Sequence, residues 1–287
     1  MDCNPFQPRH NDRWLAATVA LRMSGRRRSR RKQIDASHQR NWLTGRNAVS
    51  ETLAADVWPV RRLCGTAEAL QRLSADGTRL RDAEVVSSDR LTELCGSRHH
   101  QGLAAQMGEF PCSTPDSLIS LIGEHPSTGK TAAPLIVICD RMQDAHNFGA
   151  ILRCADAMSV SAVVIGDREQ VGITPQVARS SAGAVNRVPI VRSDALPTTV
   201  QELKDAGVHL VAATEQATDA PWNIASHRTT ALVIGSEARG ISVDLLDLCD
   251  QHVAIPMHGQ ANSLNAAVAA GILLYELRRS AIPQSEP

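Results

Sequence analysis

Six short runs of apolar residues recur between residues 135 and 256, and the stretches between them place apolar residues at helical spacing. Because the apolar residues in each run are consecutive rather than alternating, we predict strands that are buried on both faces. Such strands, joined by helices, form a parallel sheet with helices on both sides, so the fold class is α/β. The predicted strands are 135–140, 162–166, 187–191, 208–214, 230–235 and 252–256, and the predicted helices are 147–158, 174–182, 194–206, 242–249 and 263–279.

A smaller alternating unit precedes this sheet. Its regular pattern begins at Trp42 with a predicted helix over 42–55, and Pro, Ser, Thr and Gly then become frequent around one short helix, as in a linker. The smaller unit has predicted strands at 60–65, 83–87 and 100–107 and predicted helices at 67–73 and 88–95. We therefore predict four parts, which are a basic disordered arm (1–40), a small α/β domain (41–110), a linker (111–133) and the parallel-sheet domain (134–281).

The formal net charge of zero conceals opposite charges in the two parts of the chain. Residues 1–110 hold 18 Lys and Arg against 12 Asp and Glu, whereas residues 111–287 hold 12 against 18. Within the arm, residues 22–32 read RMSGRRRSRRK, a block of like charge that predicts disorder. The block either strengthens RNA binding by releasing counterions or is an arginine-rich terminus without a role, and the sequence favours neither.

Several classes of protein are disfavoured by the sequence. It has no run of eighteen apolar residues, and its start does not resemble a secretory signal. The seven cysteines are scattered and never spaced as CxxC, so we expect a cytoplasmic protein without disulfides or a metal site. Residues 123–131, GEHPSTGKT, approximate a nucleotide-binding P-loop, but they precede a strand and have five residues between the glycines where the motif has four.

A few histidines and tryptophans invite a functional interpretation. His99 and His100 are adjacent, but no further Cys or His stands nearby, so we expect ordinary histidines rather than metal ligands. Trp42, Trp58 and Trp222 could stack on bases, although packing is the simpler interpretation of each.

Three loops that follow predicted strands carry the polar residues best suited to chemistry, because ligands of parallel sheets bind at the carboxyl ends of strands. Taken singly, Asn147 and Ser263 also fit ordinary helix caps, and Arg153 fits an exposed helix arginine. The first loop and its helix (140–158) contain Asn147, Gly149 and Arg153, the second (234–242) places Glu237 between Gly235 and Gly240, and the third (255–265) places Ser263 and Asn265 at a helix start.

Together these segments resemble the three ordered motifs of the SpoU (TrmH-like) RNA ribose 2′-O-methyltransferases of the SPOUT superfamily. The motifs read NxGxxxR from Asn147, GSExxG from Gly235 and IPMxGxxxSLN from Ile255, within residues 134–280. Residues 45–53, GRNAVSETL, and 100–105, HQGLAA, resemble the ribosomal-protein-L30e-like substrate-binding domain of the large-subunit rRNA branch. One departure is Asn186, which stands where a Glu is common in the family.

The resemblance implies a fold, a cofactor and roles for particular residues. It implies a deep trefoil knot in the C-terminal parallel-sheet domain, a homodimer, and binding of S-adenosyl-L-methionine. Arg153 would contact the target phosphate and assist the hydroxyl, and Asn147 and Glu237 would orient Arg153 and the RNA. The implied catalytic residues are Arg153, Asn147, Glu237, Ser263 and Asn265, and the implied cofactor-binding residues are Thr214, Gly235, Ile255, Met257 and Leu264.

The function that the resemblance implies is methylation of a ribose 2′-hydroxyl, with a guanosine of 23S rRNA as the first expectation. The L30e-like front domain favours rRNA, and tRNA is the alternative substrate. A non-catalytic RNA-binding assembly factor on the same fold is a further alternative, but Arg153, Ser263 and Asn265 are all present. A metabolic enzyme of ordinary doubly wound fold would need GxGxxG or a true P-loop, and the sequence has neither.

Overall fold

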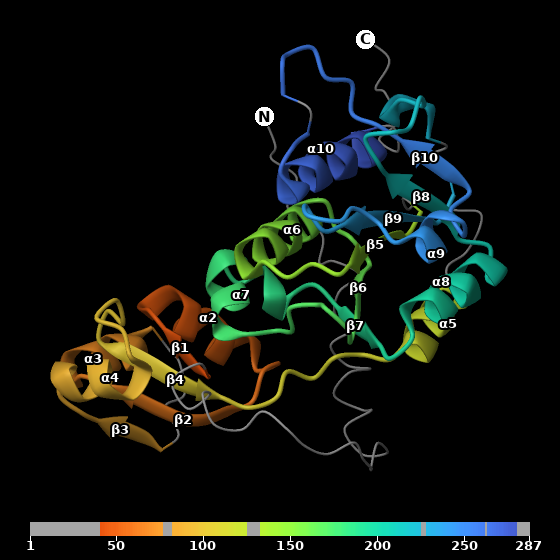
Figure 1. Cartoon of the computed structure of the whole chain (residues 1–287). Helices are drawn as coiled ribbons and strands as arrows, with labels where there is room; N and C mark the ends of the chain where they lie inside the picture. The colour runs from red at the N-terminus through yellow and green to blue at the C-terminus, as the bar shows by residue number, and fades with distance from the viewer. Residues whose placement is uncertain (1–40, 77–81, 125–132, 225–227, 262, 280–287) are drawn as a thin grey trace, which may run out of the picture.

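The computed structural model describes residues 41–76, 82–124, 133–224, 228–261 and 263–279. The predicted basic arm lies outside these residues. The described chain forms two sheets, a small one in the front domain and a large parallel one in the second domain (Figure 1). In the described part of the chain, no helix is both long and apolar enough to cross a membrane.

The front domain contains a four-stranded sheet in the order β1-β4-β2-β3. The sequence interpretation was wrong for Trp42–Thr44, which forms strand β1 rather than the start of a helix, because its three buried residues pair antiparallel with β4. Gly45 follows with φ of 99°, and the helix begins only at Arg46. The remaining elements are β2 (Val60–Gly65), β3 (Ala83–Val85), β4 (Leu103–Met107), α2 (Arg46–Ala55), α3 (Ala67–Ala75) and α4 (Ser88–Cys95).

The second domain contains six parallel strands in the order β10-β8-β9-β5-β6-β7. The chain runs outward from β5 to β7, crosses to β8, and returns to place β9 between β8 and β5. The carboxyl ends of β5 and β9 therefore meet where the strand order reverses, the usual ligand-binding place in such sheets. The strands are β5 (Leu135–Asp140), β6 (Ala162–Gly166), β7 (Ile190–Ser193), β8 (His209–Ala213), β9 (Thr230–Gly235) and β10 (Gln251–Val253).

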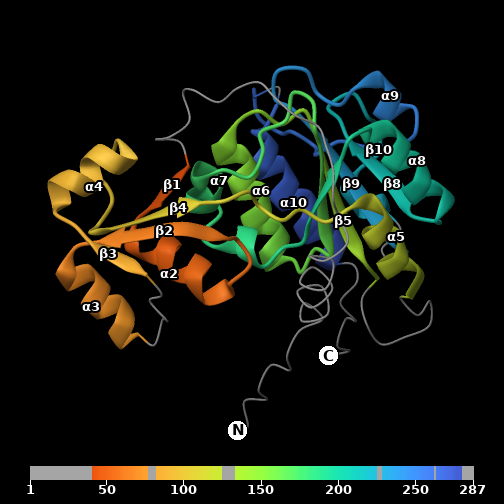
Figure 2. The same ribbon diagram turned by 90° about the horizontal axis from the view of Figure 1, so that it is seen from below.

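Helices cover both faces of the large sheet, as the sequence predicted (Figure 2). Helices α6 (Ala145–Ala157), α7 (Pro175–Ser180) and α10 (Ala266–Arg279) bury apolar side chains against one face. Helices α5 (Pro115–Glu124), α8 (Leu196–Asp205) and α9 (Val243–Leu246) bury theirs against the other. Helix α5 lies in the predicted linker, but its Leu118 is fully buried and belongs to the core of the second domain.

The two domains are joined by contacts from α7 and the 3-10 turn η2 (Ala184–Asn186) to β1 and α2. Asn186 Nδ2 donates to Thr52 Oγ1 of α2 at 3.3 Å, and Asn186 is only 5% exposed. Its Oδ1 is buried without a partner in the described chain. The residue that departs from the family pattern therefore lies in the domain interface and not among the residues of the motifs.

Candidate active site

The three loops singled out in the sequence lie at the carboxyl edge of the large sheet, where β5 and β9 are neighbours. Asn147 lies in the first turn of α6, Glu237 lies in the loop after β9, and Asn265 immediately precedes α10. Strands β5 and β9 pair in parallel register up to Asp140 and Gly235, so their loops begin at the same level. The sheet thus brings together residues up to 118 positions apart in the chain.

Asn147, Glu237 and Asn265 form one hydrogen-bonded cluster. Asn147 Nδ2 donates to Glu237 Oε1 at 2.8 Å, and Asn265 Nδ2 donates to the same oxygen at 2.5 Å and to Asn147 Oδ1 at 2.9 Å. The backbone N–H of Ala266 adds a third donor to Glu237 Oε1 at 3.3 Å. Three donors on one oxygen fix the orientation of this carboxylate and of both amides.

The helix caps differ from those considered in the sequence. Asp144, and not Asn147, caps α6, because its Oδ1 accepts from the backbone N–H groups of His146 and Asn147. Asn265, and not Ser263, caps α10 by accepting from the N–H groups of Ala267 and Val268. Since Asp144 fills the cap position, the side chain of Asn147 is free to bind Glu237.

Gly235 lets the loop that carries Glu237 fold back onto the end of β9. A Cβ atom on Gly235 would lie 2.1 Å from the carbonyl carbon of Gly240. The turn is closed by a hydrogen bond from Gly240 N–H to the Ser236 carbonyl at 2.8 Å. A side chain at position 235 would collide with backbone, so this position requires glycine.

A buried carboxylate at the end of β5 ties the same loop to the sheet. Asp140 is 4% exposed, and its Oδ2 accepts from the Ser242 N–H at 2.6 Å and from Arg141 Nε at 3.2 Å. Arg141 also donates to the Gly240 carbonyl at 3.3 Å. The sequence analysis missed both residues, although a charged pair directly after a buried strand was a usable signal.

Arg153 and Ser263 do not take part in the hydrogen bonds of the cluster. Both side chains are exposed, and neither forms a hydrogen bond or ion pair with another residue of the described chain. We expected Asn147 and Glu237 to orient Arg153. In the structure these two side chains form hydrogen bonds with one another and with Asn265, and neither forms one with Arg153. Arg153 lies six residues beyond Asn147 on α6, or about 9 Å along the helix axis.

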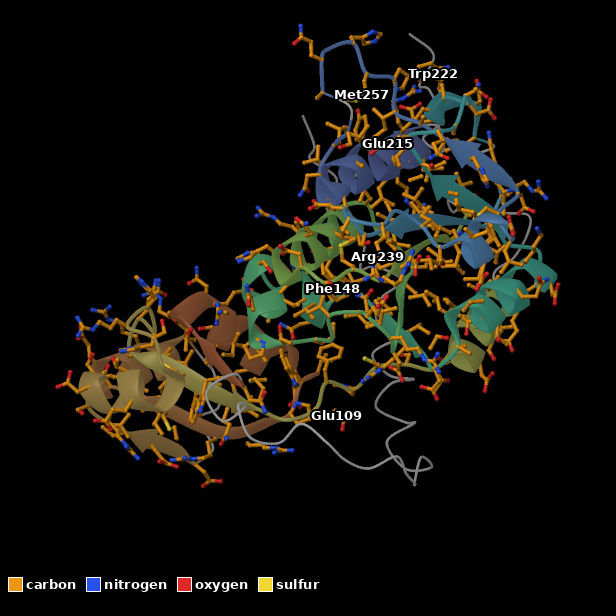
Figure 3. The ribbon with its side chains drawn as sticks, in the orientation of Figure 1. Glu109, Phe148, Glu215, Trp222, Arg239 and Met257 are labelled. Carbon is orange, nitrogen blue, oxygen red and sulfur yellow. The ribbon has the colours of Figure 1, made fainter. Side chains whose placement is uncertain are left out.

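The five residues implied for cofactor binding lie beside this cluster. Thr214 follows β8, Gly235 ends β9, Ile255 and Met257 follow β10, and Leu264 precedes α10. Strands β10, β8 and β9 are consecutive in the sheet, so these residues share its carboxyl edge. Thr214, Ile255 and Leu264 are half-buried, whereas Met257 is exposed on the loop between β10 and α10 (Figure 3).

A hollow of about 150 Å³ adjoins the cluster and is lined by Asn147, Glu237, Arg141, Glu169 and Arg239. Arg239 Nη1 contacts Glu169 Oε2 at 2.9 Å, which links the Glu237 loop to the loop after β6. This exposed pair was missed by the sequence analysis because only the fold brings the two residues together.

Cysteines near the site are protonated at neutral pH. Burial raises the pKa of the Cys139 thiol to about 12, and burial also raises the pKa of Cys154. Neutral thiols are weak nucleophiles and weak metal ligands, so neither cysteine fits a covalent role.

Of the other side chains considered in the sequence, His100, Trp42 and Trp58 have structural environments, whereas His99 and Trp222 are exposed. In His100, Nδ1 accepts from the Gly102 N–H and Nε2 bonds to Thr92 Oγ1, so both ring nitrogens have protein partners. Trp42 and Trp58 are buried, whereas Trp222 is 62% exposed. No group of three or more His, Cys, Asp or Glu among the described residues could hold a metal ion.

Comparisons with known proteins agree with this geometry. The profile of the SpoU rRNA Methylase family matches residues 134–275, and the profile described as RNA 2′-O ribose methyltransferase substrate binding matches residues 42–111. A Bacillus subtilis protein named as a TrmH family tRNA/rRNA methyltransferase, YacO, is 34% identical over 257 residues, covering 87% of this chain and all of that protein. A Staphylococcus aureus protein named in the same way is 41% identical over 198 residues, covering 68% of this chain and 77% of its own.

Solved structures show the same architecture in both domains. The SpoU methyltransferase AviRb of Streptomyces viridochromogenes aligns with a TM-score of 0.69 at 26% identity, over 84% of this chain and 90% of its own. The structure of AviRb with its cofactor AdoMet aligns with a TM-score of 0.68 at 27% identity, over 83% and 89% of the two chains. The profile, the full-length relative and the shared fold agree, and the chain belongs to the SpoU (TrmH) family of RNA 2′-O-ribose methyltransferases.

Proposed function

We propose that the chain methylates the ribose 2′-hydroxyl of a guanosine in 23S rRNA, with S-adenosyl-L-methionine as the methyl donor. The observation that carries this proposal is the Asn147–Glu237–Asn265 cluster, which joins one residue from each family motif at one edge of the sheet. The substrate-binding profile over residues 42–111 supports a structured RNA substrate. The names of the relatives include both tRNA and rRNA, and tRNA is therefore the alternative outcome of the test.

The residues present fit the methyl donor. Thr214 offers a hydroxyl group at the end of β8, and the apolar side chains of Ile255 and Leu264 lie half-buried at the same sheet edge. Together with Gly235 and Met257, these residues would hold the cofactor, which supplies an electrophilic methyl group. These residues end or follow β8, β9 and β10 or precede α10, whereas Arg153, the residue proposed to contact the RNA, lies on α6.

We assign positioning and electrostatic roles to the polar residues. The three donors all bind Glu237 Oε1, and the second oxygen, which has no partner among the described residues, can accept a hydrogen bond from the RNA. Arg153 would hold the phosphate next to the target ribose, and Ser263 would add a contact at the start of α10. A guanidinium is not deprotonated near neutral pH, so another group takes the hydroxyl proton and Arg153 stabilises the charge that develops.

The proposal is tested with unmodified transcripts. The full chain is incubated with labelled S-adenosyl-L-methionine and 23S rRNA or tRNA transcripts, and 2′-O-methylation is mapped by nucleotide. We expect incorporation at one guanosine of 23S rRNA and none in tRNA. Incorporation in tRNA alone would replace the rRNA substrate, and the absence of incorporation into either RNA would refute the proposed activity.

We also propose that the chain acts as a homodimer, as the family resemblance implies. Val268, Ile272 and Tyr275 stand at i, i+4 and i+7 on α10 and are 50%, 43% and 57% exposed, which makes an apolar stripe on its outer face. Trp222, which is also exposed, lies in the 3-10 turn η3 (Pro221–Asn223), and this turn contacts α10. In a two-fold symmetric dimer, the stripe of one copy packs against the same stripe of the other copy.

An aspartate in this stripe tests the dimer. We expect Ile272→Asp to weaken self-association at least about 100-fold, because an unpaired carboxylate in an apolar interface costs several kcal/mol. Light scattering across a concentration series measures the change. Val243→Asp is the matched control, since Val243 is 68% exposed on α9, and it should stay dimeric. A monomeric wild-type chain, or a dimer unaffected by Ile272→Asp, would contradict the proposal.

Two further predictions from the sequence concern the path of the chain and its location. The trefoil knot follows from the family resemblance, and it fits a sheet in which β9 lies between two strands that precede it in the chain. A cytoplasmic location follows from the scattered cysteines, and the cysteines of the described chain are unpaired.

A further inference from the structure

One line of arginines crosses the joint between the two domains without acidic partners. Eight other arginines of the described chain pair with nearby carboxylates, at positions 62, 72, 90, 141, 187, 192, 239 and 279. Arg46, Arg98, Arg153 and Arg179 are exposed, and within the described residues none of them forms an ion pair. A guanidinium left free of carboxylates can bind a phosphate without first breaking a salt bridge.

The line begins on α6, beside the active cluster. His146, Ala150 and Arg153 stand at i, i+4 and i+7 and form the solvent-facing stripe of this helix. Asn147 flanks the stripe on the side of Glu237, and Gly149 flanks it on the side of α7. The stripe therefore leads from the proposed site of methyl transfer toward α7.

Helix α7 carries the line to the front domain. Ser180 Oγ donates to the Ala145 carbonyl at 2.9 Å, which holds the end of α7 against the start of α6. The preceding residue, Arg179, donates from Nη1 to Thr44 Oγ1 of β1 at 3.4 Å. Figures 1 and 2 both place α7 between α6 on one side and β1 with α2 on the other.

The line ends on the front domain. Arg46 is two residues beyond Thr44, and its backbone N–H donates to Gln101 Oε1 at 3.0 Å. This bond places Arg46 next to the loop that contains the exposed Arg98 and His99. Each step from Arg153 to Arg98 is thus fixed by a helix register, a hydrogen bond or adjacency in the chain.

We propose that Arg46, Arg98 and Arg179 bind consecutive backbone phosphates of the substrate RNA, so that the RNA lies across the domain joint and enters the site past Arg153. This inference rests on the proposed function, and it adds the path that the RNA substrate takes across the protein. The contacts are to phosphate, so they fix position and register and carry no base preference. The front domain then sets which nucleotide reaches Asn147, because both ends of the RNA segment are held.

Salt-dependent binding tests the line. We expect Arg46→Ala and Arg179→Ala each to lower the slope of log affinity against log salt by about 0.7 to 0.9, and to raise the KM for RNA about 10-fold with little change in kcat. Affinity for a 23S rRNA transcript is measured from about 50 to 200 mM KCl. Arg179→Lys keeps the charge and should restore the slope.

Two controls separate phosphate binding from structural effects. Arg228 is exposed and unpaired within the described chain but lies just before β9, at the opposite edge of the sheet, and Arg228→Ala should leave the slope unchanged. Thr44→Val removes the partner of Arg179 and leaves its charge, so it should also keep the slope. A slope loss in Thr44→Val equal to that in Arg179→Ala would overturn the assignment, because Arg179 would then act by holding the joint.

The experiment distinguishes failure of the line from failure of the proposed function. If the wild-type chain methylates RNA while Arg46→Ala and Arg179→Ala keep its salt slope and its KM, these arginines do not bind the RNA phosphates. The proposed function is then unaffected. If the wild-type chain methylates neither transcript, the proposed function is wrong, and the slopes still decide whether these arginines bind phosphate.

Discussion

Replacing Arg153 with alanine is expected to lower kcat for methyl transfer about 100- to 1,000-fold at saturating RNA, the usual effect of removing one preorganised electrostatic contact. The fold should be unaffected, because the Arg153 side chain is exposed and forms no hydrogen bond or ion pair with another residue of the described chain. Binding of S-adenosyl-L-methionine should also be unchanged, since the proposed cofactor residues follow β8, β9 and β10 rather than α6. Single-turnover methylation and calorimetric titration with the cofactor measure the two quantities separately.

The conservative variant Arg153→Lys refines this expectation. A lysine keeps the positive charge but cannot form the two parallel hydrogen bonds of a guanidinium with a phosphate. An intermediate loss is therefore expected, smaller than that of the alanine variant. Turnover of Arg153→Ala close to that of the wild type would show that Arg153 has no part in methyl transfer.

The order of strands and helices in the second domain was readable from the sequence because the strands are buried on both faces. Leu135–Asp140 and Thr230–Gly235 lie at the predicted positions. Three consecutive buried residues at Trp42–Thr44 escaped detection because a strand of three residues has no measurable period, and the helix that follows at Arg46 extended its pattern over them.

The site was predictable as a set of residues but not as a set of contacts. The motifs placed Asn147, Glu237 and Asn265 at one sheet edge, and the structure joins them by hydrogen bonds. Which residue caps each helix depends on backbone angles that the sequence does not specify, so Asp144 was overlooked as the cap of α6. Asp140 and Arg141 escaped for a related reason, since their partners follow β9, about a hundred residues later.

The line of arginines adds information about the course of the RNA that the family motifs do not provide. Family motifs identify groups that act near the methyl donor, whereas Arg46 and Arg179 lie on opposite sides of the domain joint. Neither arginine has a carboxylate partner within the described chain. This property distinguishes them from arginines such as Arg62, Arg187 and Arg239, whose ion pairs only the structure shows.

Replacing Gly235 with alanine is expected to lower methyl transfer at least about 100-fold, because a displacement of about 1 Å in a positioned group costs that much. The new Cβ would lie 2.1 Å from the Gly240 carbonyl carbon and 2.3 Å from the Ile241 nitrogen. Since both clashes are with backbone, a side-chain rotation cannot relieve them and the loop has to open. Opening the loop moves Glu237 away from Asn147 and Asn265.

The same change should weaken cofactor binding, which separates it from Arg153→Ala. Gly235 lies where the cofactor is proposed to bind, and the loop it closes is held by Asp140 through Ser242. Both cofactor affinity and kcat should therefore fall in Gly235→Ala, as measured by titration and single-turnover assay. Thermal unfolding should show a loss of about 1 to 3 kcal/mol, the usual cost of overpacking, with the fold retained.

Gly123→Ala is the matched control for this variant. Gly123 lies in α5, and a Cβ there would meet nothing within 4 Å. Alanine in a helix is favoured over glycine by about 0.5 to 1 kcal/mol, so stability should rise slightly and methylation should not change. If Gly235→Ala kept both wild-type cofactor affinity and wild-type turnover, the loop of Glu237 would not form part of the active site, and the cluster around it would be only structural.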